Sequence, residues 1–436
     1  MPRLPAAVIG DAHRNSIAWE TLESLVDVGN RMAGQDGEEA AAEVVAEAFE
    51  GASLQDVTME SFEIPGWWRG ATTLSLPDHD QHYGDPHQLF ALPGTPAGEV
   101  ETGIVDVGHG TPEEFDEADV EGALVLASSK TPDDYDRWLH RREKYHEAAD
   151  RGAAGFLFRN HVEGCLPPTG GVSDADGPGP IPAAGVSREL GHRLVRYCER
   201  GEVSGSLDID CRNEMTTSQN VSARIGPETD QEVLVTAHYD AHDIAEGAED
   251  NGAGSALVAE VGRLLASVED DLEVGVRCVT FGAEEMGLRG SRHMVGVADL
   301  DGIKAVVNLD GIGGSRELGV DVHGFDGLAD AFEAASEDLD TPIEVKDDFV
   351  THSDHWPFVR AGVPGLMAHS VTDDDGRGWG HTHADTLDKL DRRDFRDLAV
   401  LLTAGTARLA ADEYPVEAVD RHTIEERAEE RGVDIE

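Results

Sequence analysis

The residues that could carry chemistry in this chain are histidines and carboxylates that follow short apolar runs. Residues 233–237 form such a run, which leads into His238 and Asp240, and Asp250 lies ten residues beyond Asp240. The remaining candidates, which follow other apolar runs or lie in a late loop, are Glu284, Glu285, Asp310 and His381. Zinc accepts imidazole nitrogen and carboxylate oxygen as ligands. A single carboxylate at a strand end is usually solvated or caps a helix, so the predicted metal site rests on the recurrence of such residues.

The elements that precede these residues are expected to bring them together. Residues 233–237, 276–281 and 304–310 are apolar runs of strand length, and residues 252–266 have the pattern of an amphipathic helix. Strands that alternate with helices predict an α/β fold, in which helices cover both faces of a mostly parallel sheet and so make three layers. Open sheets of this kind bind their ligands at the carboxyl ends of the strands. The sequence therefore predicts that the candidate residues converge at one edge of one sheet.

Changes in the apolar pattern divide the chain into several parts. We expect an N-terminal part of the main domain over residues 1–97, an inserted α/β domain over 98–215, the main catalytic domain over 216–415 and an acidic C-terminal helix or tail over 416–436. Within the first part, residues 57–64 alternate like a strand, which Pro65 and the residues after it are expected to break. Residues 77–97 are rich in proline, glycine, histidine and aspartate, and predict a loop or linker.

The charge of the chain is extreme. It contains 88 acidic and 34 basic residues, for a formal net charge of -54, and the acidic residues are spread along the whole length. Such self-repulsion destabilises a compact protein unless salt screens it, so the composition predicts adaptation to very high salt. The same charge excludes nucleic acid and anionic membranes as partners.

The cysteines and the apolar segments indicate where the protein works. The four cysteines have no CxxC spacing, which is typical of reduced thiols in a cytosol. No apolar run is long enough to span a bilayer, and the N-terminus lacks the apolar core of a secretory signal. We therefore expect a cytoplasmic protein in a salt-rich cytosol. The sequence carries no signal for an oligomeric state.

Several segments together resemble one family of enzymes. In chain order they read HYD, EDNGAGSA, TFGAEEMGLRGS, NLDGIG, SDHWPF with AGVP, and HTHADTLDKL, and they span about residues 218–390. Each segment is weak alone, but the full set in this order resembles the zinc aminopeptidase group of the M28 metallopeptidases. Residues 98–212 resemble the protease-associated (PA) domain that many members carry. The segment around Asp250 also resembles members related to plasma glutamate carboxypeptidase.

The resemblance implies a zinc-exopeptidase fold and two zinc ions per subunit, and it gives each candidate residue a role. It implies hydrolysis of the N-terminal peptide bond of a peptide substrate by a hydroxide held between the two metals. The implied roles, by position in this sequence, are His238 and Asp310 on one zinc, Glu285 and His381 on the other, Asp250 as the bridging carboxylate, Asp240 as the carboxylate that orients His238, and Glu284 as the general base.

Some residues stay open on the sequence alone. By spacing, either His381 or His383 could be the ligand; the family pattern selects His381. Three further histidines, for which the sequence does not decide between lining the site and lying elsewhere, are His242, His352 and His355. The run from Ser353 to His355 contains the three residue types of a nucleophilic triad, but adjacent residues rarely reach triad geometry, so we reject that interpretation.

Other functions compete with the aminopeptidase interpretation. A carboxypeptidase or dipeptidase on the same scaffold would need a cation for the substrate carboxylate, and the candidates are Arg289, Arg292, Arg316 and Arg377. A glutaminyl cyclase on a related scaffold would use one zinc, and a non-catalytic receptor relative would have lost ligands. The complete ligand set argues against both of these.

Overall fold

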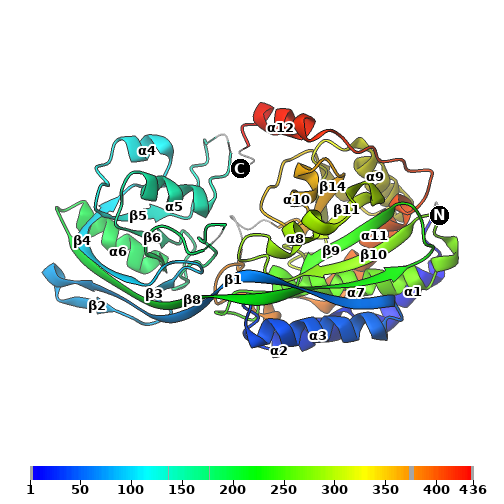
Figure 1. Cartoon of the computed structure of the whole chain (residues 1–436), viewed down its shortest axis with the longest axis horizontal. Coiled ribbons are helices and arrows are strands. Elements are labelled where there is room, and N and C mark those ends of the chain that lie inside the picture. Colours follow the sequence, from blue (N-terminus) through cyan, green and yellow to red (C-terminus); the bar gives the residue numbers. More distant parts are fainter. Residues whose placement is uncertain (1–2, 136, 176, 373–377, 434–436) are drawn as a thin grey trace.

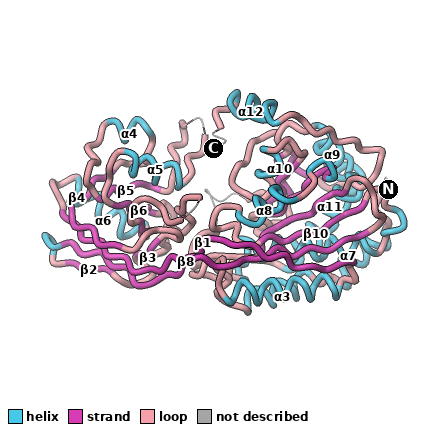
Figure 2. The backbone as a smooth tube through the Cα atoms, in the orientation of Figure 1, coloured by secondary structure: helices cyan, strands magenta, loops and turns pink. Residues whose placement is uncertain are grey.

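The computed structural model describes residues 3–135, 137–175, 177–372 and 378–433. These residues form two lobes that are joined along one side by a pair of long strands (Figures 1 and 2). The two strands are β1 (Gln55–Leu76) and β8 (Ser204–Ile225), which pair with each other antiparallel from one lobe into the other. Because both strands run through both lobes, the lobes share one continuous sheet.

The larger lobe is built on the carboxyl-terminal strands. In spatial order its sheet runs β13, β12, β14, β11, β9, β10, β8. Its four middle strands are mutually parallel: β14 (Gly365–Ser370), β11 (Ile303–Leu309), β9 (Glu232–His238) and β10 (Gly275–Phe281). The strands at its margins are β12 (Leu318–Asp321) and β13 (Ile343–Lys346). The expected mostly parallel sheet is therefore confirmed, and its four middle strands point their carboxyl ends to the same edge.

Helices cover both faces of this sheet. The main apolar core lies under α7 (Ala253–Ala266) and α11 (Arg392–Leu409), and a smaller core around Phe281 and Phe358 lies on the opposite face. The other helices of this lobe are α1 (Ala6–Asn15), α2 (Ala18–Asp27), α3 (Asp36–Gly51), α8 (Arg289–Val297), α9 (Asp326–Leu339), α10 (Trp356–Arg360) and α12 (Arg421–Glu430). Figure 1 places α2 and α3 below the sheet and α8 and α10 above it. The three expected layers are confirmed.

The smaller lobe is a second α/β unit. Its sheet continues from β8 through β4 (Gly98–Asp106), β5 (Leu124–Ser128), β6 (Gly155–Arg159) and β7 (Ala183–Val186), the last four of which are parallel to one another. Its helices are α4 (Pro112–Asp116), α5 (Arg141–Asp150) and α6 (Arg188–Cys198). It has a core of its own around Tyr145 and Phe156. The residue limits expected for the domains remain a prediction.

Two local predictions were wrong. Strand β1 continues through Pro65 and Gly66, which lie opposite Met215 and Glu214 of β8. At Pro65, strand β1 pairs with β8 on one side and, among the described residues, has no neighbouring strand on the other. Proline, which has no N–H to donate, is tolerated at such an edge position. A Cβ on Gly66 would lie 2.5 Å from Thr216 Cγ2, so glycine permits the close approach of the strands there. The segment 77–97, expected as a loop, contains the short strands β2 (Gln81–Tyr83) and β3 (Leu89–Ala91).

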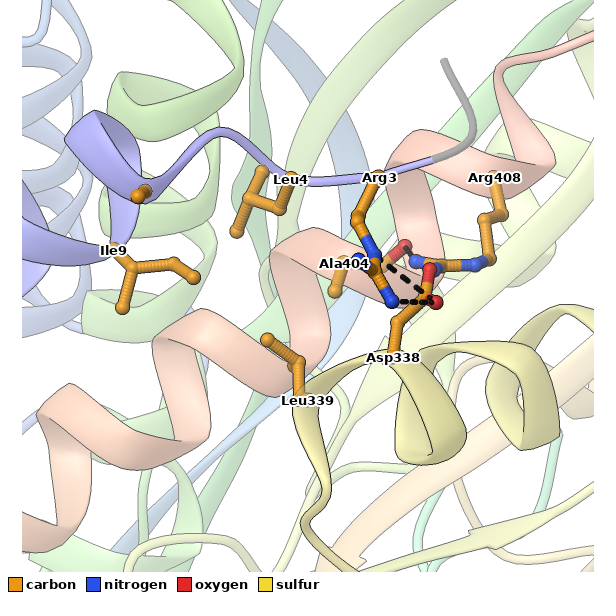
Figure 3. A pocket seen from close by; sticks show the side chains of 8 residues that line it. Arg3, Leu4, Ile9, Asp338, Leu339, Ala404 and Arg408 are labelled. Carbon is orange, nitrogen blue, oxygen red and sulfur yellow. Dashed lines mark hydrogen bonds and ion pairs between the residues drawn. The ribbon is translucent and has the colours of Figure 1, made fainter.

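A hollow on the larger lobe lies apart from the candidate residues. It is formed by the N-terminal segment, α9 and α11, and it holds an ion-paired cluster of Arg3, Asp338 and Arg408 (Figure 3). The carboxyl end of α11 borders this hollow, and Lys304 near the start of β11 donates to the carbonyl of Ala411 just beyond α11. The hollow is therefore near the amino ends of the parallel strands. Among the described residues, no helix combines the length and apolar character that crossing a bilayer requires.

Candidate metal centre

The carboxyl ends of the four parallel strands deliver most of the candidate residues to one place. His238 is the last residue of β9, Glu284 and Glu285 follow β10, and Asp310 follows β11. His381 lies in the long connection after β14, and Asp250 lies between β9 and α7. Parallel strands share a carboxyl edge, which is why residues more than 100 positions apart meet here. The structure thus brings the candidate residues together at one edge of the sheet, as the strand pattern predicted.

The first group of ligand-type side chains is His238, Asp250 and Asp310. One atom from each lies within 4.8 Å of the others. Nε2 of His238 is 3.4 Å from Oδ1 of Asp250 and 3.7 Å from Oδ1 of Asp310. Nδ1 of the same ring lies 3.1 Å from the backbone oxygen of Asp240. A proton on Nδ1 leaves the lone pair of Nε2 facing the two carboxylates, as metal-binding histidines require.

The second group lies beside the first. Nε2 of His381 is 3.2 Å from Oδ2 of Asp250 and 3.4 Å from Oε2 of Glu285. A third ring, that of His242, places Nε2 2.9 Å from the same Glu285 oxygen. The two oxygens of Asp250 thus face different histidines, Oδ1 toward His238 and Oδ2 toward His381. A carboxylate placed in this way suits a ligand that two cations share.

The donor set fits divalent cations. The side chains of His238, Glu285 and His381 are at most 7% exposed, and that of Asp250 is 11% exposed. Nε2 of His238 and Oε1 of Glu285 are buried without a hydrogen-bond partner among the described residues. Buried polar atoms are nearly always paired, and clustered buried carboxylates need compensating positive charge. Cations between the two groups would satisfy both requirements.

The pKa shifts express the same shortage of positive charge. Burial raises the pKa of Glu285 to about 7 and the pKa of Glu284 well above its ordinary value. Burial alone would also raise the pKa of Asp250, but the imidazoles of His238 and His381 beside it hold this pKa well below its usual range. The charged forms of both glutamates are thus destabilised here, and bound cations would offset this destabilisation.

Asp240 supports the centre from behind. Its carboxylate accepts the backbone N–H groups of Glu284 and Glu285 at 3.0 and 3.2 Å, and it lies 3.4 Å from Nδ1 of His238. It therefore fixes one histidine and the turn that carries both glutamates. Glu284 belongs to neither of the two groups, and its Oε2 is 3.9 Å from Nε2 of His238.

Two residues hold the loop that carries Asp250. The carboxylate of Asp385 accepts the backbone N–H groups of Glu249 and Asp250 at 2.8 and 3.1 Å. The guanidinium of Arg31, fully buried, donates to the carbonyls of Tyr239, Glu246 and Gly247, as well as to one in α2. Arg31 was not among the predicted site residues, because a lone arginine between two helices carries no signal for so distant a set of carbonyls.

The smaller lobe also contacts the centre directly. The backbone N–H of Thr169 donates to the carbonyl of His381 at 2.8 Å, and the carbonyl of Thr169 accepts from Nδ1 of His381 at 3.1 Å. Arg141, at the start of α5, donates to the carbonyls of Thr169 and Gly171. This loop therefore orients His381 with Nε2 toward Asp250 and Glu285. The part of the chain expected to be an insert contributes to the geometry of the candidate metal centre.

Replacing Arg141 with methionine is expected to loosen this loop. The carbonyls of Thr169 and Gly171 would lose a buried donor, which costs about 1–3 kcal/mol of unfolding free energy. Because His381 would be held less firmly, metal affinity should fall by about 10–100-fold. Urea unfolding in molar salt and competition with a chelator measure the two effects. Arg196→Met, at an exposed position of α6, is the control and should change neither; unchanged metal affinity in Arg141→Met would show that the loop does not position His381.

The remaining histidines and the triad residues lie outside the two groups, except His242. His383 is half-buried and belongs to neither group, whereas His381 belongs to the second. His352 stacks on His140 of the smaller lobe, with ring centroids 4.2 Å apart, and His355 contacts the carbonyl of Val350. Ser353 donates its hydroxyl to Asp310, so it supports a candidate ligand and forms no triad with His355.

The four arginines considered as partners for a substrate carboxylate lie in different environments. Arg289 donates to the carbonyls of Met286, Asp174 and Ala175. Arg316 is exposed and lies 3.8 Å from Asp397, and Arg292 is exposed on α8. Arg377 lies outside the described residues.

Comparison with known proteins decides the family. The model of peptidase family M28 matches residues 220–404, and the model of the PA domain matches residues 92–194. Aminopeptidase YwaD of Bacillus subtilis is 30% identical over 405 residues, which cover 89% of this chain and 83% of that protein. The chain belongs to peptidase family M28. It is a metallo-exopeptidase with a PA domain, as the resemblance in its sequence implied.

Other members of family M28 differ in the activity that their names describe. Carboxypeptidase Q of Bos taurus is 27% identical over 427 residues, which cover 93% of this chain and 87% of the relative. The zinc aminopeptidase BSAP from Bacillus subtilis superposes with a TM-score of 0.70 at 26% identity, over 89% of this chain and 93% of the other. A peptidase M28 precursor from Shewanella amazonensis, at 24% identity, shares the fold with a TM-score of 0.77 over 95% and 97% of the two chains.

Proposed function

We propose that this M28 peptidase is a zinc-dependent aminopeptidase that uses two zinc ions per subunit, with Glu284 as the general base. The observation that supports it most is the placement of Asp250, whose two carboxylate oxygens face the imidazoles of His238 and His381. Asp310 completes the first group and Glu285 the second. Two complete groups speak against a cyclase that uses one zinc and against a relative that has lost ligands.

The chain's own residues then perform the proton transfers. When bound, a pair of divalent cations supplies Lewis acidity and lowers the pKa of water. Glu284 accepts the proton of the water that attacks the scissile carbonyl, and it returns that proton to the amine when the carbon–nitrogen bond breaks. Asp240 holds the backbone of Glu284 in place and the ring of His238 in one orientation. Thr169 does the same for His381.

The preference for a free amino terminus rests on the charges around the centre. Asp354 is a buried carboxylate that belongs neither to the two groups nor to the proposed proton transfer. Surplus acidic groups attract an α-ammonium group rather than a carboxylate. Arg289, one of the arginines expected to bind a carboxylate, instead donates to backbone carbonyls of the smaller lobe. A carboxypeptidase is the rival, because Carboxypeptidase Q matches 93% of the chain.

Peptides with blocked ends test the proposal. In molar salt and with added zinc, we expect cleavage of a peptide with a free amino terminus and an amidated carboxyl terminus. We expect no cleavage of the same peptide when its amino terminus is acetylated. Cleavage that requires a free carboxylate instead would establish the carboxypeptidase, and cleavage that requires both ends free would establish a dipeptidase. Mass spectrometry of the products identifies the bond that is cut.

We also propose that the protein works at high salt, in a salt-rich cytosol. The Debye length falls from about 10 Å at 0.1 M salt to about 3 Å at 1 M, which weakens the repulsion within a chain of net charge -54. Raising potassium chloride across this range should therefore raise Tm. Because the unfolding entropy grows with chain length, a gain of about 3 kcal/mol corresponds to about 3 °C in a protein of this size. Sucrose at equal osmolality measures the stabilisation that does not depend on charge screening, and salt should raise Tm by more than sucrose does. A Tm that does not change with salt would contradict the proposal.

A further inference from the structure

His242 is buried in the centre without a role in the ligand set that the resemblance implied. It lies four residues beyond His238, in the connection from β9 to α7, and it is 5% exposed. Its ring meets that of His381 edge-on, with centroids 4.7 Å apart and planes at 79°. Nitrogen or oxygen atoms of His242, Glu285 and His381 lie within 4.8 Å of one another. The ring therefore borders the second group as closely as the residues that define it.

The polar atoms of His242 are left for a ligand. Nε2 lies 2.9 Å from Oε2 of Glu285, yet the orientation of this contact does not make a hydrogen bond. Neither Nε2 nor Nδ1 of His242, nor Oε1 of Glu285, has a hydrogen-bond partner among the described residues. Leaving buried polar atoms unpaired is costly. A nitrogen and an oxygen that face each other without a hydrogen bond suit a cation placed between them.

The backbone around His242 holds the ring in place. The N–H of Ala241 donates to the carbonyl of Arg31 at 3.1 Å. On the other side, the carboxylate of Asp243 receives two hydrogen bonds from Arg69, at 2.9 and 2.6 Å. Both neighbours of His242 are thus fixed by residues from distant parts of the chain. A ligand that is held before metal binding loses little conformational entropy when the metal arrives.

We propose that His242 is an additional protein ligand of the second metal position, bound through Nε2. This inference rests on the proposed function, because it assigns a further ligand to the same centre. The second position then receives His242, His381, Glu285 and the shared Asp250, while the first receives His238, Asp310 and Asp250. Sites closed by four protein ligands retain their metal, and sites with three keep a position for water or substrate. We therefore expect the second position to fill first and the first position to be the more open one.

Metal affinity and cobalt absorption test the assignment. His242→Gln has nearly the size of histidine and can still hydrogen bond to Glu285, but amides are poor ligands for zinc. In chelator competition we expect the variant to lower the affinity for the more tightly bound zinc ion by more than about 100-fold. That loss is larger than the change of about 10–100-fold expected when a residue that only hydrogen-bonds to a ligand is removed. The visible absorption of the first Co²⁺ equivalent should change as well. His383→Gln, a change outside both groups in the connection after β14, is the control. It should change neither the zinc affinity nor the cobalt spectrum.

The outcomes separate this inference from the proposed function. If the wild type binds two ions and His242→Gln binds both with unchanged affinity and cobalt spectrum, His242 is not a ligand, although the proposed centre stands. If the wild type binds no metal, the proposed function and this inference fail together. His242→Ala with added imidazole distinguishes loss of a ligand from collapse of the loop. Imidazole should restore tight metal binding only if an imidazole nitrogen is the missing ligand. Failure of imidazole to do so, in a variant that keeps the wild-type circular dichroism, would also overturn the assignment.

Discussion

Glu284→Gln should lower kcat by about 10²–10⁴-fold, the usual contribution of a general base, and should leave the metal content unchanged. Glu284 is outside both groups of ligand-type side chains, and its Oε2 lies 3.9 Å from Nε2 of His238. Glutamine has the same shape, and its backbone N–H can still donate to Asp240. It cannot accept a proton from water at neutral pH. The change therefore removes the proton transfer while the side chain continues to fill the same space.

Separate measurements of kcat, KM and bound zinc decide the role of Glu284. Because substrate binding is not affected, KM should stay within a fewfold of its original value. Glu317→Gln, at an exposed position just before β12, is the matched control and should retain full activity. If Glu284→Gln loses a metal ion, the residue is a ligand and not a base. If the variant keeps its full kcat, another group is the base, and the buried carboxylate of Asp354 is the first alternative to test.

The positions of the candidate ligands could be predicted because they depend on the sheet. His238 and Asp310 end or follow apolar runs that are strands β9 and β11, and parallel strands share one carboxyl edge. The same reasoning placed Glu284 and Glu285 after β10. For His381 the strand pattern was insufficient, since this residue lies in a long connection beyond β14, and only the family pattern selected it over His383.

The supporting contacts could not be predicted, since they depend on backbone atoms of distant segments. Thr169 meets His381 through its N–H and carbonyl groups, which every residue except proline has, so the side-chain sequence carries no signal of the contact. Asp385 accepts the backbone N–H groups of Glu249 and Asp250, which lie 136 and 135 positions earlier in the chain. Such contacts become visible only when both lobes are in place.

The fold shows the same division between local and distant causes. Strands β9, β10 and β11 and helix α7 were predicted because their apolar patterns are strong. The continuation of β1 through Pro65 was missed because local rules treat proline followed by glycine as a break. The pairing with β8 over almost its whole length overrides that preference. A partner strand from 150 residues further along the chain decides the outcome, and the local sequence does not contain it.

Asp250→Asn is expected to affect both metal positions at once. One oxygen of Asp250 faces His238 and the other faces His381, so the asparagine must turn its NH₂ group toward one of the two groups. That group cannot bind a cation, and the whole centre loses one negative charge. We expect tight binding to fall from two zinc ions to one or none. Loss of about 4 kcal/mol of transition-state stabilisation corresponds to a decrease of about 10³-fold in kcat/KM.

Asp310→Asn is the control that isolates the bridging role of Asp250. Asp310 lies only in the first group, at 3.7 Å from Nε2 of His238, so its variant should keep the ion between Glu285 and His381. Thermal unfolding with and without zinc gives a second measurement, because a bound ion stabilises the folded state by an amount that grows with the logarithm of its affinity. We expect zinc to raise Tm most in the wild type, less in Asp310→Asn and least in Asp250→Asn. If the two variants lose the same single ion, Asp250 serves one metal only, and the two groups do not share a carboxylate.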